Sequence, residues 1–394
     1  MSLKLALHAS VVLTLLYSST GNGAGSPAAQ AQDEVPNPHV RWIVTEDFDQ
    51  NAPHDPIVVN DKVIVGTDLG EIRAYRCEDG ELEWDYQHGF RIFNRPCTDG
   101  KRVYISSEVG VVAVNVDDGE EVWRLFRDHL NGPIHVLAEK EMVYVGGEDG
   151  FLYALDAMTG EQTWVAEFII DAPPDPPGFS GEKARISNTL ARPSALASDG
   201  ETLYLSIFDQ CRIVAVTATD GKRLWSFQSD GWVFGSAVAT RKHVYFGSQD
   251  ETFYCLDKET GRKVWSKKTA GRIESGGAVD DDFVYFGSCD GGLYCLNQST
   301  GDVRWRFAAD KKDGRNTAIY SVPILCQGVA VFAAGEGQAY AVDVPTGALR
   351  WKIRPSEDSE LFCSPASDGT SFFVVTRANN ENLGAPSLLA IGRK

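Results

Sequence analysis

ESGGAVDDDFVYFGSCDGGLYCLNQSTGDVRWRF, residues 274–307, is the clearest copy of a unit that repeats along this chain. Its run 283–286 is rich in aromatic and branched residues, which favours a short strand buried on both faces. Asp290-Gly291 predicts a hairpin turn after it, and Thr300-Gly301 predicts a second turn. One such sheet cannot bury both faces alone, so it must stack on neighbouring units. The unit has four expected antiparallel strands, at about 276–279, 283–286, 293–296 and 303–307.

The same unit recurs, and its clearest mark is a glycine followed four residues later by a tryptophan. The pairs are Gly80/Trp84, Gly119/Trp123, Gly160/Trp164, Gly221/Trp225, Gly261/Trp265, Gly301/Trp305 and Gly347/Trp351. Trp42 stands one repeat earlier, and the successive steps from it are 42, 39, 41, 61, 40, 40 and 46 residues. A period near 40 with many short strands is typical of a radial or stacked repeat. We expect these eight tryptophans to occupy one outer-strand position and to dock neighbouring units.

Eight units fit between Trp42 and the end of the chain, which predicts an all-β fold. We expect an eight-bladed β-propeller of four-stranded antiparallel blades. The last unit has its third strand at 388–391 and then stops, whereas 40–44 supplies a lone strand at the other end. The N-terminal strand should therefore complete the last blade, which closes the ring and shields its edges.

The first 31 residues have the pattern of a secretory signal peptide. Lys4 precedes an apolar run at 5–17, and Ala29-Gln30-Ala31 forms a small-x-small cleavage site. The run is too short to span a bilayer. We expect residues 32–394 to form the mature propeller, located in the periplasm or outside the cell. Retention of the segment as an anchor is the alternative.

The net charge disfavours nucleic acid as a partner, and the cysteine spacing disfavours a zinc site. The formal charge is −18, which disfavours nucleic acid because phosphate binding needs basic grooves. None of the eight cysteines stands in a C-x-x-C pair, so the spacing of a zinc site is absent. Cys255 and Cys295 occupy equivalent places in consecutive repeats, where alanine stands in others, and should fill the core. Disulfide pairing stays open at this point.

Strands such as LYALD at 152–156, followed by a Thr-Gly turn and a tryptophan, carry a family resemblance. Over its mature length the chain resembles the quinoprotein (PQQ-like) β-propeller repeat family, closest in style to BamB-like outer-membrane assembly scaffolds. The resemblance implies an exported, non-enzymatic, monomeric scaffold that binds a protein partner in the cell envelope. It also implies an alternative, since other members of the family are quinone-dependent dehydrogenases.

Such dehydrogenases typically carry two adjacent cysteines under the quinone, with calcium ligands nearby. This chain has no adjacent cysteines. The chain also lacks the serine-hydrolase, zincin and P-loop motifs. We therefore assign no catalytic residue, no metal ligand and no cofactor, and pyrroloquinoline quinone with calcium enters only under the dehydrogenase alternative. A carbohydrate-binding or small-ligand-binding propeller is a further alternative.

Binding residues are expected where the chain departs from its period. In an up-and-down blade, the turn between the second and third strands and the link to the next blade emerge on one face. Insertions at 169–192, 308–320 and 377–386 fall in these places, and loops on a rigid barrel commonly carry function. In the assembly scaffolds a loop of leucine and arginine on this side contacts the partner, although Leu190 and Arg192 do not match it residue by residue. The expected binding face includes Asn94, Arg95, Arg192, Trp232, Glu274 and Arg315.

Overall fold

The computed structural model describes most of the chain after the predicted signal peptide. The described residues are 38–45, 54–67, 69–92, 94–168, 193–312, 314–335, 337–355, 359–361, 363–378 and 386–392. The segment 1–31 lies outside them. Over the described residues, no helix has the length and apolarity needed to cross a membrane.

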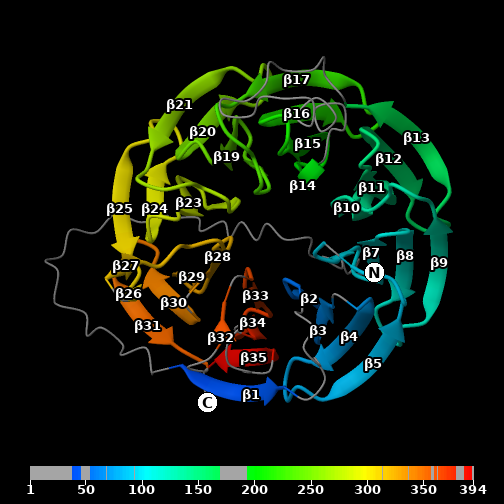
Figure 1. The fold of residues 1–394 in the computed structure, drawn as a ribbon, viewed down its shortest axis with the longest axis horizontal. Helices are drawn as coiled ribbons and strands as arrows, with labels where there is room; N and C mark the ends of the chain where they lie inside the picture. The colour runs from blue at the N-terminus through cyan, green and yellow to red at the C-terminus, as the bar shows by residue number, and fades with distance from the viewer. Residues whose placement is uncertain are drawn as a thin grey trace, which may run out of the picture.

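Eight sheets are arranged in a closed ring (Figure 1), which confirms the predicted eight-bladed propeller. In seven blades the strands follow chain order from the axis to the rim. Blades 1 to 4 consist of β2 (Ile57–Val59), β3 (Lys62–Gly66), β4 (Glu71–Arg76) and β5 (Leu82–Gln87); β6 (Cys97–Thr98), β7 (Arg102–Ser107), β8 (Gly110–Asn115) and β9 (Glu121–Phe126); β10 (Ile134–Leu137), β11 (Met142–Gly146), β12 (Phe151–Asp156) and β13 (Gln162–Glu167); and β14 (Pro193–Ser198), β15 (Thr202–Ile207), β16 (Arg212–Thr217) and β17 (Arg223–Gln228).

The remaining blades follow the same plan, with the eighth built from both ends of the chain. Blades 5 to 7 consist of β18 (Val238–Ala239), β19 (His243–Gly247), β20 (Thr252–Asp257) and β21 (Lys263–Lys268); β22 (Gly277–Val279), β23 (Phe283–Gly287), β24 (Gly292–Asn297) and β25 (Val303–Ala308); and β28 (Ile324–Cys326), β29 (Val329–Ala334), β30 (Gln338–Asp343) and β31 (Leu349–Ile353). Blade 8 combines β33 (Ala366–Ser367), β34 (Ser371–Ala378), β35 (Ser387–Gly392) and β1 (His39–Val44), with β32 (Ser359–Glu360) also paired to β34. Outside the blades lie η1 (Ala138–Lys140) and a hairpin of β26 (Lys311–Lys312) and β27 (Arg315–Asn316).

Pairing of the two ends of the chain closes the ring, as predicted. β1 is antiparallel to β35, with Val44 opposite Leu388 and Trp42 opposite Ala390. Arg41 adds a hydrogen bond from its guanidinium to the Ser371 hydroxyl at 2.6 Å. The terminal strand therefore occupies an edge that would otherwise expose unpaired backbone groups.

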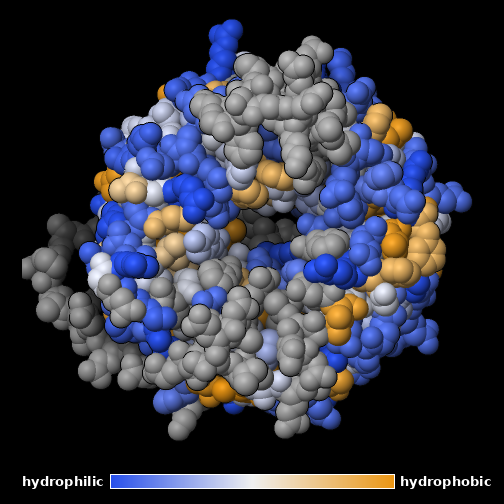
Figure 2. Space-filling model, viewed as in Figure 1, coloured by the Kyte–Doolittle hydropathy of each residue, from blue (hydrophilic) through white to orange (hydrophobic). Residues whose placement is uncertain are grey.

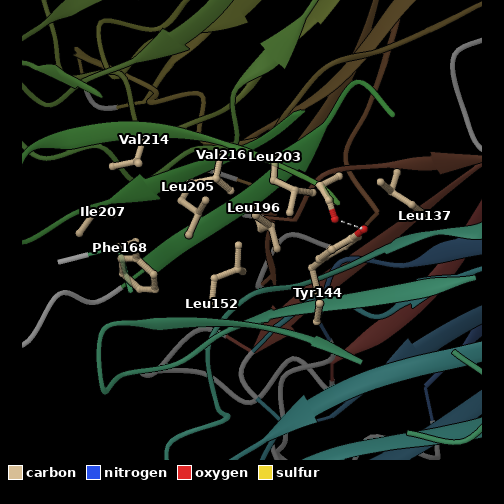
Figure 3. Packing of buried hydrophobic residues seen from close by; sticks show 12 residues of the cluster. Leu137, Tyr144, Leu152, Phe168, Leu196, Leu203, Leu205, Ile207, Val214 and Val216 are labelled. Atoms are coloured by element: carbon tan, nitrogen blue, oxygen red, sulfur yellow. Dashed lines mark hydrogen bonds between the residues drawn. The ribbon is translucent and has the colours of Figure 1, made fainter. Parts of the chain in front are cut away.

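The hydrophobic core lies between blades rather than within one. The second and third strands of each blade are buried on both faces, as the sequence KVIVG of β3 shows by having all five residues buried. One cluster joins Leu152 of β12 to Leu203 and Leu205 of β15 across two blades (Figure 3). Cys255 and Cys295 are fully buried, and all eight cysteines are free thiols.

The glycine and the tryptophan of each pair contact different neighbours. At seven contacts the tryptophan of one blade packs against the glycine turn of the next. These contacts are Trp42/Gly80, Trp84/Gly119, Trp123/Gly160, Trp164/Gly221, Trp225/Gly261, Trp265/Gly301 and Trp305/Gly347. Trp351 faces blade 8, where the chain ends meet and no such turn exists, and its ring centroid lies 6.0 Å from that of Phe372.

In six of these contacts the indole Nε1 also donates a hydrogen bond to a carbonyl of the next blade. The donors and acceptors are Trp42 to Cys77, Trp84 to Val116, Trp123 to Ala157, Trp225 to Lys258, Trp265 to Gln298 and Trp305 to Val344, at 2.8 to 3.1 Å. At Gly261 an added Cβ would lie 2.6 Å from Cδ2 of Trp225, and the φ angle is +67°. Only glycine meets both demands at this turn.

We predict that Gly261→Ala destabilises the fold more than Gly328→Ala does. Both glycines have a positive φ, but an added Cβ at Gly328 meets no atom within 4 Å. Gly328→Ala should therefore cost about 1–2 kcal/mol in unfolding free energy from the left-handed backbone alone. Gly261→Ala should cost roughly 1–3 kcal/mol more, because the methyl group pushes the indole away. Urea denaturation measures both, and equal losses would show that the indole contact contributes little.

We also predict that stability falls as the pH drops from about 6.5 to about 4. Burial, with the nearby Arg124 charge, lowers the pKa of His88 to about 4. Its Nε2 lies 2.7 Å from the Ser107 hydroxyl, and its buried Nδ1 has no partner among the described residues. The unfolded chain takes up the proton first as the pH falls, so the folded state loses up to about 3 kcal/mol from this group.

Unfolding free energies measured from pH 7 to pH 4.5 test this assignment. His88→Gln should show a shallower loss than the parent protein, because glutamine does not titrate. Part of the slope should persist, since burial also lowers the pKa of His135 to about 4. His39→Gln, at an exposed position of β1, serves as the control. An unchanged slope in His88→Gln would contradict the assignment.

Candidate functional site

Two kinds of segment emerge on one face of the ring, which we call the link face. They are the turns between the second and third strands and the links between blades. The expected insertion 169–192, including Arg192, lies outside the described residues, as does most of 377–386. The described parts of the link face include the turns 147–150, 208–211, 248–251 and 288–291 and the links 88–92, 94–96, 127–133, 229–237, 269–276 and 314–323. Figure 2 shows the ring hollowed at its centre.

Asn94 and Arg95 hold neighbouring links together. The Asn94 amide donates to the carbonyls of Asn131 and Gly132, both at 3.0 Å. The Arg95 guanidinium donates to the carbonyl of Pro56 in the preceding blade at 3.0 Å. Their polar groups therefore bind backbone across two blade boundaries.

Trp232 belongs to a cluster of three half-buried aromatic rings. It lies in the link from β17 to β18, together with Phe234, and Phe208 comes from the turn between β15 and β16. The rings of Phe208 and Phe234 are stacked at 5.3 Å between centroids. Trp232 meets Phe208 edge-on at 6.1 Å and Phe234 at 6.0 Å. Three aromatic rings thus gather on the link face between blades 4 and 5.

Glu274 is joined to this cluster through Gln249. The Gln249 side-chain amide donates to a Glu274 carboxylate oxygen at 2.7 Å, and the Gln249 backbone N–H donates to the Trp232 carbonyl at 2.8 Å. Arg272 approaches the same carboxylate, with its Nε 3.6 Å from Oε1. Gln249, Glu274 and Arg272 therefore form a polar network on the link face, between the aromatic cluster and blade 6.

Arg315 stands apart from the other expected residues. It is exposed on β27, opposite Lys312 of β26, in the hairpin that joins blade 6 to blade 7. The structure thus joins Trp232 to Glu274 and places Asn94 beside Arg95. It does not bring Arg315 into either group.

Phe208, Phe234 and Gln249 were missed by sequence reasoning. Phe234 stands two residues after Trp232 in GWVFG, and that spacing was an available signal. Phe208 and Gln249 come from turns of two different blades, and nothing in their local sequence marks them as neighbours of Trp232.

The titratable groups nearby favour binding over nucleophilic chemistry. Burial is the main cause that raises the pKa of the Cys289 thiol, to about 11, and Glu274 adds to it. The thiol therefore stays protonated at neutral pH. Within the described ranges, no three His, Cys, Asp or Glu side chains lie close enough together to hold a metal ion.

Known proteins resemble parts of the chain at the sequence level. It is 28% identical over 147 residues to the quinoprotein ethanol dehydrogenase of Pseudomonas putida, covering 30% of this chain and 24% of that protein. It is 28% identical over 121 residues to the outer membrane protein assembly factor BamB of Alkalilimnicola ehrlichii, covering 28% of this chain and 31% of that protein. The matches thus span about a quarter and about a third of these relatives.

Similarity of fold covers nearly the whole chain. The crystal structure of BamB from Moraxella catarrhalis superposes with a TM-score of 0.68 at 15% identity, covering 91% of this chain and 98% of that one. The family model described as outer membrane protein assembly factor BamB matches residues 35–174 and 183–381. The repeat, the closed eight-bladed ring and this match agree, and the chain belongs to the BamB-type family of PQQ-like β-propellers.

Proposed function

We propose that this protein is an exported, non-enzymatic scaffold that binds a protein partner of the cell envelope through its link face. The match to the family described as an outer membrane protein assembly factor supports this proposal. It also points to a partner involved in the assembly of outer membrane proteins.

The aromatic cluster of Phe208, Trp232 and Phe234 is the observation that carries the proposal. Aromatic residues are enriched at the energetic centres of protein interfaces. All three rings are half-buried, so each is held in place while part of it faces solvent. These aromatic side chains are attached to turns and links of a rigid propeller. They therefore lose little conformational freedom on binding, which favours affinity.

The polar network beside the aromatic cluster supplies specificity in this proposal. Glu274, held by Gln249 and approached by Arg272, places charged groups beside the rings. A polar rim around an apolar centre is the usual arrangement at protein interfaces. The partner should therefore present an apolar side chain flanked by hydrogen-bonding groups.

We predict that Trp232→Ala weakens capture of the partner from the native envelope by more than tenfold. Loss of a central interface tryptophan typically costs at least about 2 kcal/mol of binding free energy. Quantitative affinity capture should compare the parent protein, Trp232→Ala and a version with a shortened 169–192 insertion. Met158→Ala is the control, because Met158 is 54% exposed in the turn between β12 and β13, on the opposite face. Identical partners and yields for all four proteins would contradict the proposal.

The dehydrogenase alternative keeps one specific observation in its favour, the similarity to a quinoprotein ethanol dehydrogenase. The plane of Trp232 suits a flat quinone. However, the chain has no adjacent cysteines, and the described residues offer no cluster of metal ligands, so the donor set does not fit quinone and calcium. We therefore derive no reaction step from it.

Incubation with pyrroloquinoline quinone and calcium separates the two functions. We expect no uptake at micromolar quinone and no reduction of an artificial electron acceptor by alcohols or sugars. Stoichiometric uptake with alcohol-dependent reduction would instead establish the enzyme.

A further inference from the structure

The contact between blades 3 and 4 departs from the other tryptophan contacts. Trp164 packs against Gly221, but its Nε1 has no hydrogen-bond acceptor among the described residues. The carbonyl in the place that accepts the indole bond elsewhere is that of Ala218. It accepts from the Tyr144 hydroxyl at 2.9 Å, the dashed line in Figure 3, but not from the indole, whereas the Ala157 carbonyl accepts from both Tyr104 and Trp123. Of the seven tryptophan–glycine contacts in the described part of the chain, this is the one without an indole hydrogen bond.

Ala166 provides the physical reason. The residue two positions after the tryptophan is larger in every other repeat: Val44, Tyr86, Leu125, Phe227, Lys267, Phe307 and Ile353. An added Cβ at Gly221 would lie 2.5 Å from Cβ of Ala166 and 2.6 Å from the outer ring atom Cζ3 of Trp164. At Gly261 the first contact is Cδ2, at the junction of the two indole rings. The Gly221 turn of blade 4 therefore packs against the small Ala166 and lies farther from the indole nitrogen.

A shallow cavity of about 360 Å³, open to solvent on one side, lies at this displaced contact. The residues that line it include Lys140, Met142, Tyr144, Thr163, Trp164 and Ala218. Its volume is within the range of small-molecule sites, which are mostly apolar with a few convergent polar groups. It lies beside the β16–β17 turn, on the face opposite the aromatic cluster of Trp232.

Two donors at the cavity, an indole N–H and a lysine ammonium, suit an anionic ligand group. The hydroxyls of Thr163 and Tyr144 already donate to the carbonyls of Ala154 and Ala218. Among the residues that the structure describes, the Trp164 N–H has no acceptor. The Lys140 ammonium is paired with Glu201 at 3.1 Å, but that carboxylate is 79% exposed, and such surface pairs are weak. A ligand carboxylate can therefore replace it at small cost.

We propose that this cavity binds a carboxylate attached to an apolar group. The apolar group packs against Trp164 and Met142, and the carboxylate accepts from the Trp164 N–H and pairs with Lys140. This chemistry has two sources, a free small carboxylic acid and the C-terminus of a peptide that ends in an apolar residue.

A second cavity, of about 290 Å³ between blades 6 and 7, provides a contrast. Three of the residues that line it are Asp280, Asp281 and Asp282, which disfavour an anion. Trp305 keeps its bond to the Val344 carbonyl there. Of these two cavities, the one between blades 3 and 4 combines a lysine with an indole N–H that bonds to no described residue, whereas the second sets three carboxylates beside Arg304.

Indole N–H signals of the mature full-length protein labelled with ¹⁵N-tryptophan test the proposal. The Trp164 signal is assigned by its loss in Trp164→Phe. The probes are 3-phenylpropanoate, the peptide Gly-Gly-Phe with a free carboxylate, and its C-terminal amide. We expect a saturable shift of the Trp164 signal with a carboxylate probe and no shift with the amide. Lys140→Gln should weaken binding about fivefold.

Ala166→Leu is the decisive variant, because it restores the side-chain volume found in other repeats. It should abolish the shift while the protein stays folded. Ser226→Leu adds the same side chain at an exposed position of β17 and should leave binding intact. A shift with only the peptide acid identifies a chain terminus as the ligand, and a shift with only the free acid identifies a small molecule.

Three results would overturn the proposal. They are no shift with any probe up to about 10 mM, an equal shift with the amide, and a shift that survives in Ala166→Leu. None of these results affects capture of a protein partner through the link face. The test of this cavity and the test of the proposed function are therefore independent.

Discussion

The packing of an indole from one blade against a glycine turn of the next is the contact on which the ring depends. A four-stranded blade exposes two apolar faces, and only another blade can cover them. At Gly261 the turn has a positive φ and no room for a side chain against Trp225. Repetition of this contact orients the blades, and pairing of β1 with β35 closes the ring without a covalent bond.

This contact explains why the fold could be predicted from the sequence. A glycine and a tryptophan four residues apart, such as Gly261 and Trp265, face two different neighbours, so each repeat carries both halves of an interface. Their period therefore reports the number of blades. Closure was also predictable, because the last repeat lacked a strand that the segment 40–44 supplied.

The candidate site was less predictable for physical reasons. Trp232 is the one tryptophan of nine that does not belong to the eight repeat positions, but Phe208 and Gln249 belong to turns of different blades. The distance of Phe208 and Gln249 from Trp232 depends on the curvature of the propeller, which cannot be derived from the period of the repeat. Asn94 and Arg95 were visible as polar residues of links, whereas their bonds to backbone of adjacent blades required coordinates. The effect of Ala166 likewise depends on where the next blade settles.

Site-specific photo-crosslinking in the native envelope shows whether a protein contacts the link face. A photoreactive phenylalanine analogue at position 234 places the crosslinker within the aromatic cluster. The same analogue at position 158 places it on the opposite face. We predict a covalent adduct with an envelope protein from position 234 and none from position 158. No adduct from position 234, or the same adduct from both positions, would contradict the account.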